Sequence, residues 1–126
     1  MISVVILTKN EEINIIDCLE SVEWCDEIVV IDDYSTDRTL QVIKNFNQRV
    51  KIFQHELKND FSQQRNFGLL KAKGDWVLFI DADERPSNSL RAEIMDYVSL
   101  KNTEYSGFYI KRKDNMWGKE LRHGEV

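Results

Sequence analysis

Two aspartates separated by one residue, Asp81 and Asp83, follow directly on the apolar run at residues 76–80. The run has the length and character of a buried strand, so both carboxylates can project into one crevice at its end. Oxygen ligands in this arrangement suit a hard divalent cation, Mg²⁺ or Mn²⁺, which would bridge them to a diphosphate. The alternative is a simple acidic turn, in which Asp83 caps the helix expected to begin near Pro86.

A second acidic pair, Asp32 and Asp33, ends another apolar run at residues 28–31. Paired carboxylates in this position could accept hydrogen bonds from the base or the ribose of a nucleotide. The structural alternative is that the polar residues at 35–37 cap the next helix. Capping accounts for one of those residues, but it leaves open why both aspartates lie at the end of the strand.

Two further polar groups are candidates for ligand binding. Thr8, Asn10 and Glu11 follow the apolar run at residues 2–7, and helix capping by Asn10 or Thr8 is the alternative there. Arg65 lies near the start of an expected helix and could reach a phosphate or a base as a forked donor. Its alternative is an ordinary solvated arginine.

Apolar runs alternate with amphipathic stretches along the whole chain. Strands are expected at residues 2–7, 28–31, 50–53, 76–80 and 107–110, and helices near 11–19, 37–46, 62–73 and 87–98. This alternation predicts an α/β fold, a mainly parallel sheet flanked by helices on both faces. Ligands of such sheets bind beyond the carboxyl ends of the strands, which is where all three loops that follow the apolar runs should meet.

Composition limits the class of protein. The 126 residues suit one compact domain, and 42% hydrophobic with 31% charged residues indicates a globular chain. A net charge of -5 makes nucleic acid a poor partner. The apolar run near the start is too short for a signal peptide or a membrane span. Cys18 and Cys25 lack a metal-ligand spacing, so we expect free thiols and a cytoplasmic chain.

Taken in order, these polar groups resemble the nucleotide-sugar half of family 2 glycosyltransferases, whose Rossmann-like α/β fold is called GT-A. The family's TxNEE is similar to residues 8–12, its VVDDGSTDxT to residues 30–39, and its ARNxGxxxAxGDyilfLDADd to residues 64–84. Within the family, Tyr34 and the stretch at 118–124 look most like lipopolysaccharide-core and related cell-envelope glucosyltransferases.

The resemblance implies an inverting hexosyltransferase that moves a sugar from a nucleoside-diphosphate donor, usually UDP, to a glycan or glycolipid acceptor of the cell envelope. Glu11 would lie near the ribose, and Asp33 would accept a hydrogen bond from uracil. A divalent cation, Mg²⁺ or Mn²⁺, held by Asp81 and Asp83 would neutralise charge on the departing diphosphate. The nucleotide-binding set implied by the family's motifs is Thr8, Asn10, Glu11, Asp33, Arg65, Asp81 and Ala82.

Three features depart from the family's pattern. Lys9 stands where many members carry an aromatic residue that could stack on the base, and Tyr34 replaces the commoner glycine. In addition, an inverting displacement needs a carboxylate base for the proton of the acceptor hydroxyl. The motif of that base has no match in the sequence, and Glu120 and Glu125 lie too near its end to be nominated.

The missing base shapes what we expect of the chain as a whole. Residues 1–126 would be the donor-binding part of a longer enzyme, with the catalytic base beyond Val126, and would be weakly active or inactive alone. We expect membrane contact, peripheral at the inner face of the cell membrane, only in the full-length protein.

Two other function classes share parts of the pattern. A phosphohydrolase with an aspartate nucleophile also has a DxD after an apolar strand, but on its first strand and usually followed by Thr or Val, where this chain has Glu84 and Arg85. A non-catalytic receiver-like domain has a similar length and acidic pair. It also needs a phosphoacceptor aspartate after a mid-chain strand, and residues 51–60 offer only Asp60.

Overall fold

The computed structural model describes residues 1–99 and 109–110. Residues 107 and 108 of the last expected strand lie outside the described residues, as do the family-like stretch at 118–124, Glu120 and Glu125. Within the described residues, no helix has the length and apolar character needed to cross a membrane.

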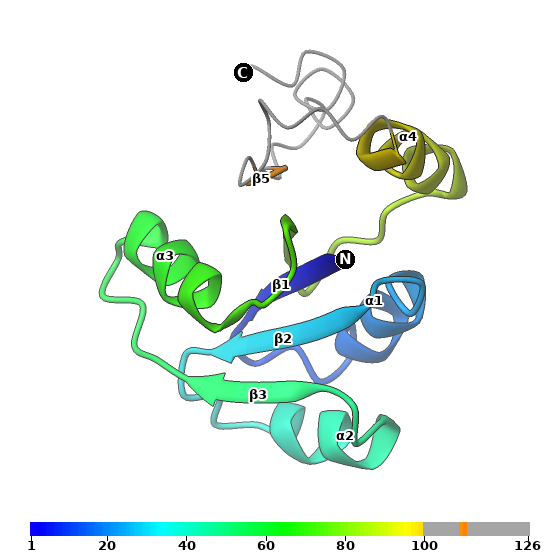
Figure 1. Cartoon of the computed structure of the whole chain (residues 1–126). Coiled ribbons are helices and arrows are strands. Elements are labelled where there is room, and N and C mark those ends of the chain that lie inside the picture. Colours follow the sequence, from blue (N-terminus) through cyan, green and yellow to red (C-terminus); the bar gives the residue numbers. More distant parts are fainter. Residues whose placement is uncertain (100–108, 111–126) are drawn as a thin grey trace.

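Strands and helices alternate along the described residues, as the apolar pattern predicts (Figure 1). The strands are β1 (Ile2–Thr8), β2 (Glu27–Asp32), β3 (Lys51–Gln54), β4 (Trp76–Asp81) and β5 (Tyr109–Ile110). The helices are α1 (Ile15–Ser21), α2 (Thr39–Phe46), α3 (Phe61–Lys71) and α4 (Asn88–Ser99). The sheet has the order β3-β2-β1-β4-β5, and every pair of neighbouring strands is parallel, so the predicted α/β fold is confirmed.

Two apolar layers hold the helices on opposite faces of the sheet. Alternate residues of a strand point to opposite faces, so Val4 and Ile6 of β1 pack in the layer that includes α1, α2 and α4. Val5 and Leu7 pack in the other layer, against α3. Because both faces are covered, β1, β2 and β4 are apolar along most of their length, which is why they appear in the sequence as continuous apolar runs rather than alternating ones.

Gly68 allows α3 to lie close to the sheet. A Cβ atom at this position would overlap Cγ1 of Val5, well inside contact distance. The first turn of α3 is capped by Asp60, whose side chain accepts a hydrogen bond from the Gln63 N–H at 3.1 Å. The start of α3 is thereby fixed beside the carboxyl ends of β1 and β2.

The start of α1 differs from the prediction. The helix begins at Ile15, after an Asn14 N-cap whose side chain makes no capping hydrogen bond, and not near residue 11. Asn10 is not its cap, because the Asn10 backbone has a left-handed φ of 54° and its amide oxygen accepts the N–H groups of Thr36 and Asp37. The Asn10 side chain therefore bonds to backbone groups distant in the sequence instead of capping the helix that follows it.

Two smaller features at the ends of helices also differ. The helix expected to run to residue 73 ends at Lys71, and Ala72 is already extended. Gly74 is needed for a close approach: a Cβ there would lie 2.6 Å from Ser3 Oγ and 2.9 Å from the Met1 carbonyl oxygen. In the last helix, the Ser87 hydroxyl, rather than Asp83, accepts the hydrogen bond of the first turn, from Leu90 N–H at 3.1 Å.

Candidate functional site

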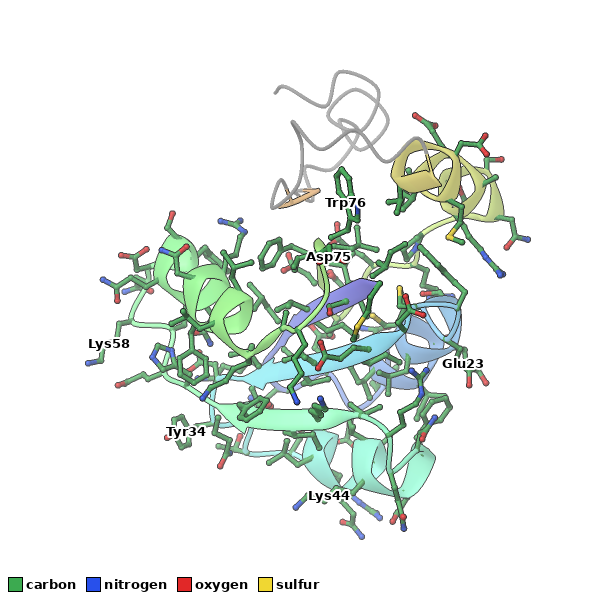
Figure 2. All side chains as sticks on the ribbon, viewed as in Figure 1. Glu23, Tyr34, Lys44, Lys58, Asp75 and Trp76 are labelled. Atoms are coloured by element: carbon green, nitrogen blue, oxygen red, sulfur yellow. The ribbon has the colours of Figure 1, made fainter. Side chains whose placement is uncertain are left out.

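A cleft of about 240 Å³ opens at the carboxyl edge of the sheet. In Figure 2, Tyr34 and Lys58 mark this end of the molecule, towards which the arrows of β2 and β3 point. The ends of β1 and β4, the loops that follow the first four strands, and the start of α3 contribute the lining residues: Leu7, Thr8, Lys9, Glu11, Asp33, Leu57, Phe61, Gln64, Asp81, Ala82 and Asp83. Strand ends of a parallel sheet meet here, as the fold predicts.

Strand register brings the three predicted loops together. Thr8 is paired with Asp32, and Leu7 with Asp81, so the loops after β2 and β4 flank the end of β1. The cleft therefore gathers six of the residues singled out in the sequence: Thr8, Glu11, Asp33, Asp81, Ala82 and Asp83. Among the described residues, Asn10 and Arg65 are predicted site residues that do not line it.

Thr8 carries a buried hydroxyl that lacks a partner. Its residue is 5% exposed, and Oγ1 makes no hydrogen bond within the described part of the chain. A buried polar group in this state costs about 1 to 3 kcal/mol, so native proteins rarely keep one without a use. Because Thr8 lines the cleft, a bound ligand can provide the missing partner.

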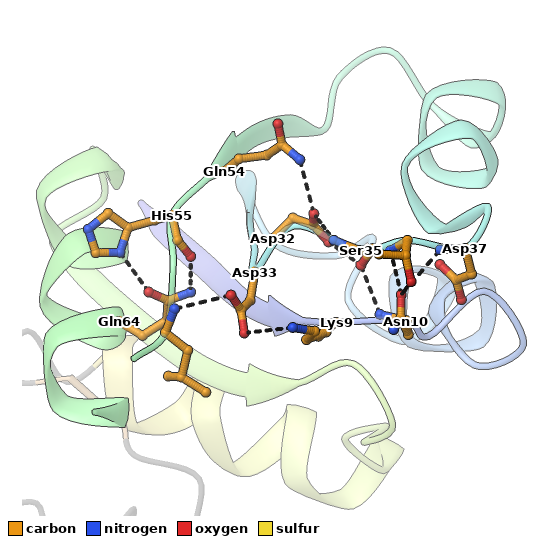
Figure 3. Close-up of polar contacts among 11 residues, drawn as sticks. Lys9, Asn10, Asp32, Asp33, Ser35, Asp37, Gln54, His55 and Gln64 are labelled. Atoms are coloured by element: carbon orange, nitrogen blue, oxygen red, sulfur yellow. Dashed lines mark hydrogen bonds and ion pairs between the residues drawn. The ribbon is translucent and has the colours of Figure 1, made fainter. Parts of the chain in front are cut away.

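Asp32, the last residue of β2, and Asp33, which follows it, have different surroundings (Figure 3). Asp32 is fully buried and accepts hydrogen bonds from the backbone N–H and the hydroxyl of Ser35, so it shapes the turn. Asp33 lines the cleft, where one carboxylate oxygen accepts the Leu57 N–H at 3.2 Å and the other lies 3.6 Å from Lys9 Nζ. Of this pair, only Asp33 can meet a ligand in the cleft.

Asn10 joins the loops that follow β1 and β2 (Figure 3). Its N–H donates to Ser35 Oγ at 2.8 Å, and its amide oxygen accepts from Thr36 N–H at 2.7 Å and Asp37 N–H at 3.2 Å. The left-handed backbone of this residue is one that asparagine tolerates well. These contacts fix the position of Glu11, the next residue, at the cleft.

Two hydrogen bonds hold the Asp81 backbone, where the acidic loop after β4 begins. The Asp81 N–H donates to Glu84 Oε1 at 2.6 Å, and the Cys18 thiol donates to the Asp81 carbonyl oxygen at 3.8 Å. Burial, with the negative charges of Glu84, Asp83 and Asp81, raises the pKa of Cys18 to about 12, so it remains a thiol. This thiol and the other buried cysteine are free, as predicted.

Asp81 and Asp83 could supply oxygen ligands to a divalent cation. Asp81 is half-buried and Asp83 is exposed, and both residues line the cleft. Among the described residues there is no group of three or more His, Cys, Asp or Glu side chains that could hold a metal ion. Mg²⁺ usually binds one or two carboxylates and completes its shell with waters and substrate phosphates, so this pair fits such an ion.

Five lining residues were absent from the predicted site: Leu7, Lys9, Leu57, Phe61 and Gln64. Gln64 directly precedes Arg65 in the third family-like motif, and Phe61 follows the Asp60 cap, so the motif and the cap were the available signals. Neither signal shows that this end of α3 faces the cleft, which depends on the packing of α3 against β1 and β2.

Comparisons with known proteins agree with the geometry of the site. The sequence model of the family described as Glycosyl transferase family 2 matches residues 3–123. The SPbeta prophage-derived glycosyltransferase SunS of Bacillus subtilis is 34% identical over 137 residues, which cover 96% of this chain and 32% of SunS. The lipopolysaccharide core biosynthesis glycosyltransferase LpsC of Rhizobium meliloti is 31% identical over 120 residues, covering 93% of this chain and 44% of LpsC.

A solved structure has the same fold. The crystal structure of residues 1–349 of TarS from S. aureus in complex with UDP matches with a TM-score of 0.68 and 30% sequence identity. The match covers 79% of this chain and 32% of the TarS chain. This chain thus spans less than half the length of each of these proteins.

Proposed function

Because the chain belongs to glycosyl transferase family 2, we propose that residues 1–126 form the donor-binding part of an inverting hexosyltransferase. The donor would be a nucleoside-diphosphate sugar. The observation that carries this proposal is the cleft itself, in which polar residues from three separate loops converge at one edge of the sheet. UDP is the expected nucleotide, because the similar TarS structure is a complex with UDP.

The cleft offers complementary groups for a uridine. Asp33 keeps carboxylate lone pairs beyond those used by Leu57 and Lys9, and these can accept the ring N–H of uracil. Glu11 is held by the Asn14 amide, which donates to its carboxylate at 3.0 Å, and can accept from ribose hydroxyls. The unpartnered Thr8 hydroxyl can bond to the same nucleotide.

We also propose that Asp81 and Asp83 hold a divalent cation, Mg²⁺ or Mn²⁺. When bound, such a cation supplies Lewis-acid stabilisation of negative charge on the diphosphate that leaves. The chain's own contribution is to hold two carboxylates at the end of β4. Glu84 and Cys18 fix the backbone of Asp81 there.

The name of one relative supports a proposal for the acceptor of the sugar. LpsC is described as an enzyme of lipopolysaccharide core biosynthesis, which supports a glycan or glycolipid of the cell envelope as acceptor. Such an acceptor would place the whole protein at the inner face of the cell membrane, as a peripheral protein. The base that takes the acceptor proton is proposed to lie beyond Val126.

Isothermal titration calorimetry with UDP tests the donor site. We expect UDP to bind when Mn²⁺ is present and much more weakly without it, and ADP and GDP to bind less well. Asp83→Asn should weaken UDP binding in Mn²⁺ by more than about tenfold, the lower range of losses seen even for outer-shell partners of a metal. Asp75→Asn is the matched control, because Asp75 is also an exposed aspartate but precedes β4 at the opposite edge.

Each arm of this titration can contradict part of the proposal. Absence of binding by UDP, ADP and GDP in the presence of Mn²⁺ would contradict the donor site. Binding of UDP that depends neither on Mn²⁺ nor on Asp83 would retain the nucleotide site and remove the metal assignment.

A further inference from the structure

The segment between β3 and α3 forms one wall of the cleft. Leu57 from this segment and Phe61 from the first turn of α3 both line the cavity. Phe61 is 51% exposed, although exposing a large aromatic side chain is unfavourable. The cleft thus has an apolar, aromatic wall in addition to its four acidic lining residues.

Hydrogen bonds to the end of β2 fix this wall. His55 N–H donates to the Asp32 carbonyl oxygen at 2.9 Å, and Leu57 N–H donates to the Asp33 carboxylate at 3.2 Å. Lys58 and Asn59 then turn the chain with left-handed φ values of 51° and 60°. The wall is therefore anchored before it reaches α3.

Gln64 anchors the other end of the wall (Figure 3). Its side chain is buried, with 2% of the residue exposed, and its Nε2 donates to the His55 carbonyl oxygen at 2.7 Å. Because a carbonyl can only accept, the amide oxygen of Gln64 faces the His55 ring, and Nδ1 at 2.7 Å must carry the hydrogen. The His55 ring also stacks on Phe67, with centroids 4.0 Å apart.

The loop after β1 does not offer a comparable aromatic surface. Lys9 lines the cleft where many family members carry an aromatic residue, and its ammonium lies 3.6 Å from the Asp33 carboxylate. Leu7 also lines the cleft, but it is 9% exposed and packs in the core. Phe61 is the aromatic residue among those that line the cleft.

We propose that Phe61, with Leu57 beside it, is the surface against which the planar base of the nucleotide packs, and that Gln64 is the residue that positions this surface. The inference rests on the proposed donor site and specifies how that site recognises a base. An aromatic face attracts any base by stacking, whereas Asp33 can select a base by its hydrogen-bonding edge. Asp33 also accepts a hydrogen bond from the Leu57 N–H. The residue that would bond to the edge of the base is therefore connected to the surface that would pack against its face.

Phe61→Ala tests the stacking surface by calorimetry with UDP and Mn²⁺. We expect UDP affinity to fall roughly tenfold, within the range found when an aromatic residue that stacks on a base is removed. Phe61→Trp should retain the affinity of the unmodified chain. Leu70→Ala is the matched control, since Leu70 is 82% exposed on the same helix and is not among the lining residues.

Inorganic pyrophosphate with Mn²⁺ is the probe that lacks a base. Its affinity should be the same for Phe61→Ala and for the unmodified chain. Unchanged UDP affinity in Phe61→Ala, or an equal loss for UDP and pyrophosphate, would overturn the inference. If the unmodified chain binds no nucleotide, the proposed donor site fails instead, so the two failures are distinct.

Gln64→Met tests the positioning role, because methionine has a similar size but cannot bridge the His55 carbonyl and ring. We expect UDP affinity to fall several-fold, while pyrophosphate affinity is retained. In a Phe61→Ala background, Gln64→Met should cause little further loss, because Gln64 acts through the wall. Losses that add fully in the double variant would contradict this role, and a thermal melt of each variant verifies that it is folded.

Discussion

The amino and carboxyl edges of the sheet, where its parallel strands begin and end, differ in how their buried polar groups are hydrogen-bonded. At the amino edge, buried Glu27 accepts hydrogen bonds from the Ser3 hydroxyl at 2.6 Å and Lys73 N–H at 2.7 Å, and pairs with Lys51 Nζ at 2.7 Å. At the carboxyl edge, the Thr8 hydroxyl has no partner within the described residues. Both edges belong to the same strands, so this difference supports the proposal that the carboxyl edge binds a ligand while the amino edge stabilises the fold.

Substitution of Glu27 should have the largest effect on stability and no effect on nucleotide binding. Glu27→Gln removes a buried charge that accepts from Ser3, Lys51 and Lys73, and we expect the free energy of unfolding to fall by about 2 to 3 kcal/mol. UDP affinity should remain unchanged, because Glu27 lies at the opposite edge from the cleft. Urea denaturation measures the first quantity and calorimetry the second.

Glu20→Gln, at an exposed position, is the control for the change in net charge. It should leave both the free energy of unfolding and UDP affinity unaltered. A loss of UDP affinity in Glu27→Gln without a loss of stability would contradict the stabilising role of the amino edge.

Low pH should reduce the free energy of unfolding, because the carboxyl groups of Glu27 and Asp37 have lowered pKa values in the folded protein. Burial acts to raise the pKa of Glu27, but hydrogen bonds from Lys51, Lys73 and Ser3 outweigh it and hold the pKa below its usual 4.5. For Asp37, slight desolvation is likewise outweighed by hydrogen bonds from Thr39 and Glu12. Each group binds fewer protons in the folded state, so stability is fully present above about pH 4.5 and falls as pH drops below it.

Urea midpoints recorded between pH 7 and pH 3 test this dependence. The midpoint should fall on the acid side, and Glu27→Gln should flatten part of the decline. A midpoint that stays constant to pH 3 would contradict the assignment.

Gly68→Ala tests how α3 is positioned at the cleft. The new methyl group would overlap the Val5 side chain, at a cost of about 1 to 3 kcal/mol, while alanine favours the helix by about 1 kcal/mol. Overpacking should win, with a net loss of about 1 kcal/mol in the free energy of unfolding. Since α3 carries Phe61 and Gln64, UDP affinity should fall as well.

Asn66→Ala is the matched control on α3, because Asn66 is exposed and is not among the lining residues. It should change neither quantity appreciably. Unchanged stability and affinity in Gly68→Ala would show that α3 can shift without affecting the cleft.

Thr8→Val should give a smaller effect of the opposite sign on stability. Valine has nearly the same shape and removes the buried unpartnered hydroxyl, so the free energy of unfolding should rise by up to about 1 kcal/mol. UDP should bind more weakly, because its proposed partner is gone. Ser3→Ala is the comparison at the other edge, where removing a hydroxyl that donates to Glu27 should reduce stability and leave binding unaltered. A stability loss in Thr8→Val would indicate that its hydroxyl already has a partner.

The sequence predicts the order of strands and helices and much of the lining of the cleft. Continuous apolar runs identify the strands because helices cover both faces of the sheet, and Thr8, Asp33 and Asp81 could be placed because they lie at or directly after strand ends. The family inferred from the ordered motifs is confirmed by the match over residues 3–123. Local order along the chain is sufficient for these features.

Contacts between distant segments explain what the sequence did not reveal. Asn10 has the type and place of a helix cap, but its partners lie 26 and 27 residues away. Spacing alone does not distinguish buried Asp32 from Asp33 in the cleft, since either could face the ligand. Gln64 reads as a polar helix residue until tertiary packing buries it against His55.

Amide hydrogen exchange with and without UDP and Mn²⁺ tests most directly whether the carboxyl edge is the binding edge. We expect added protection at residues 8–11, 33, 55–64 and 81–84, the segments that contain the residues lining the cleft. Residues 3, 27 and 73–75 at the amino edge should exchange as in the free protein. Protection that gathers at the amino edge, or that spares residues 55–64 and 81–84 while UDP is bound, would contradict this expectation.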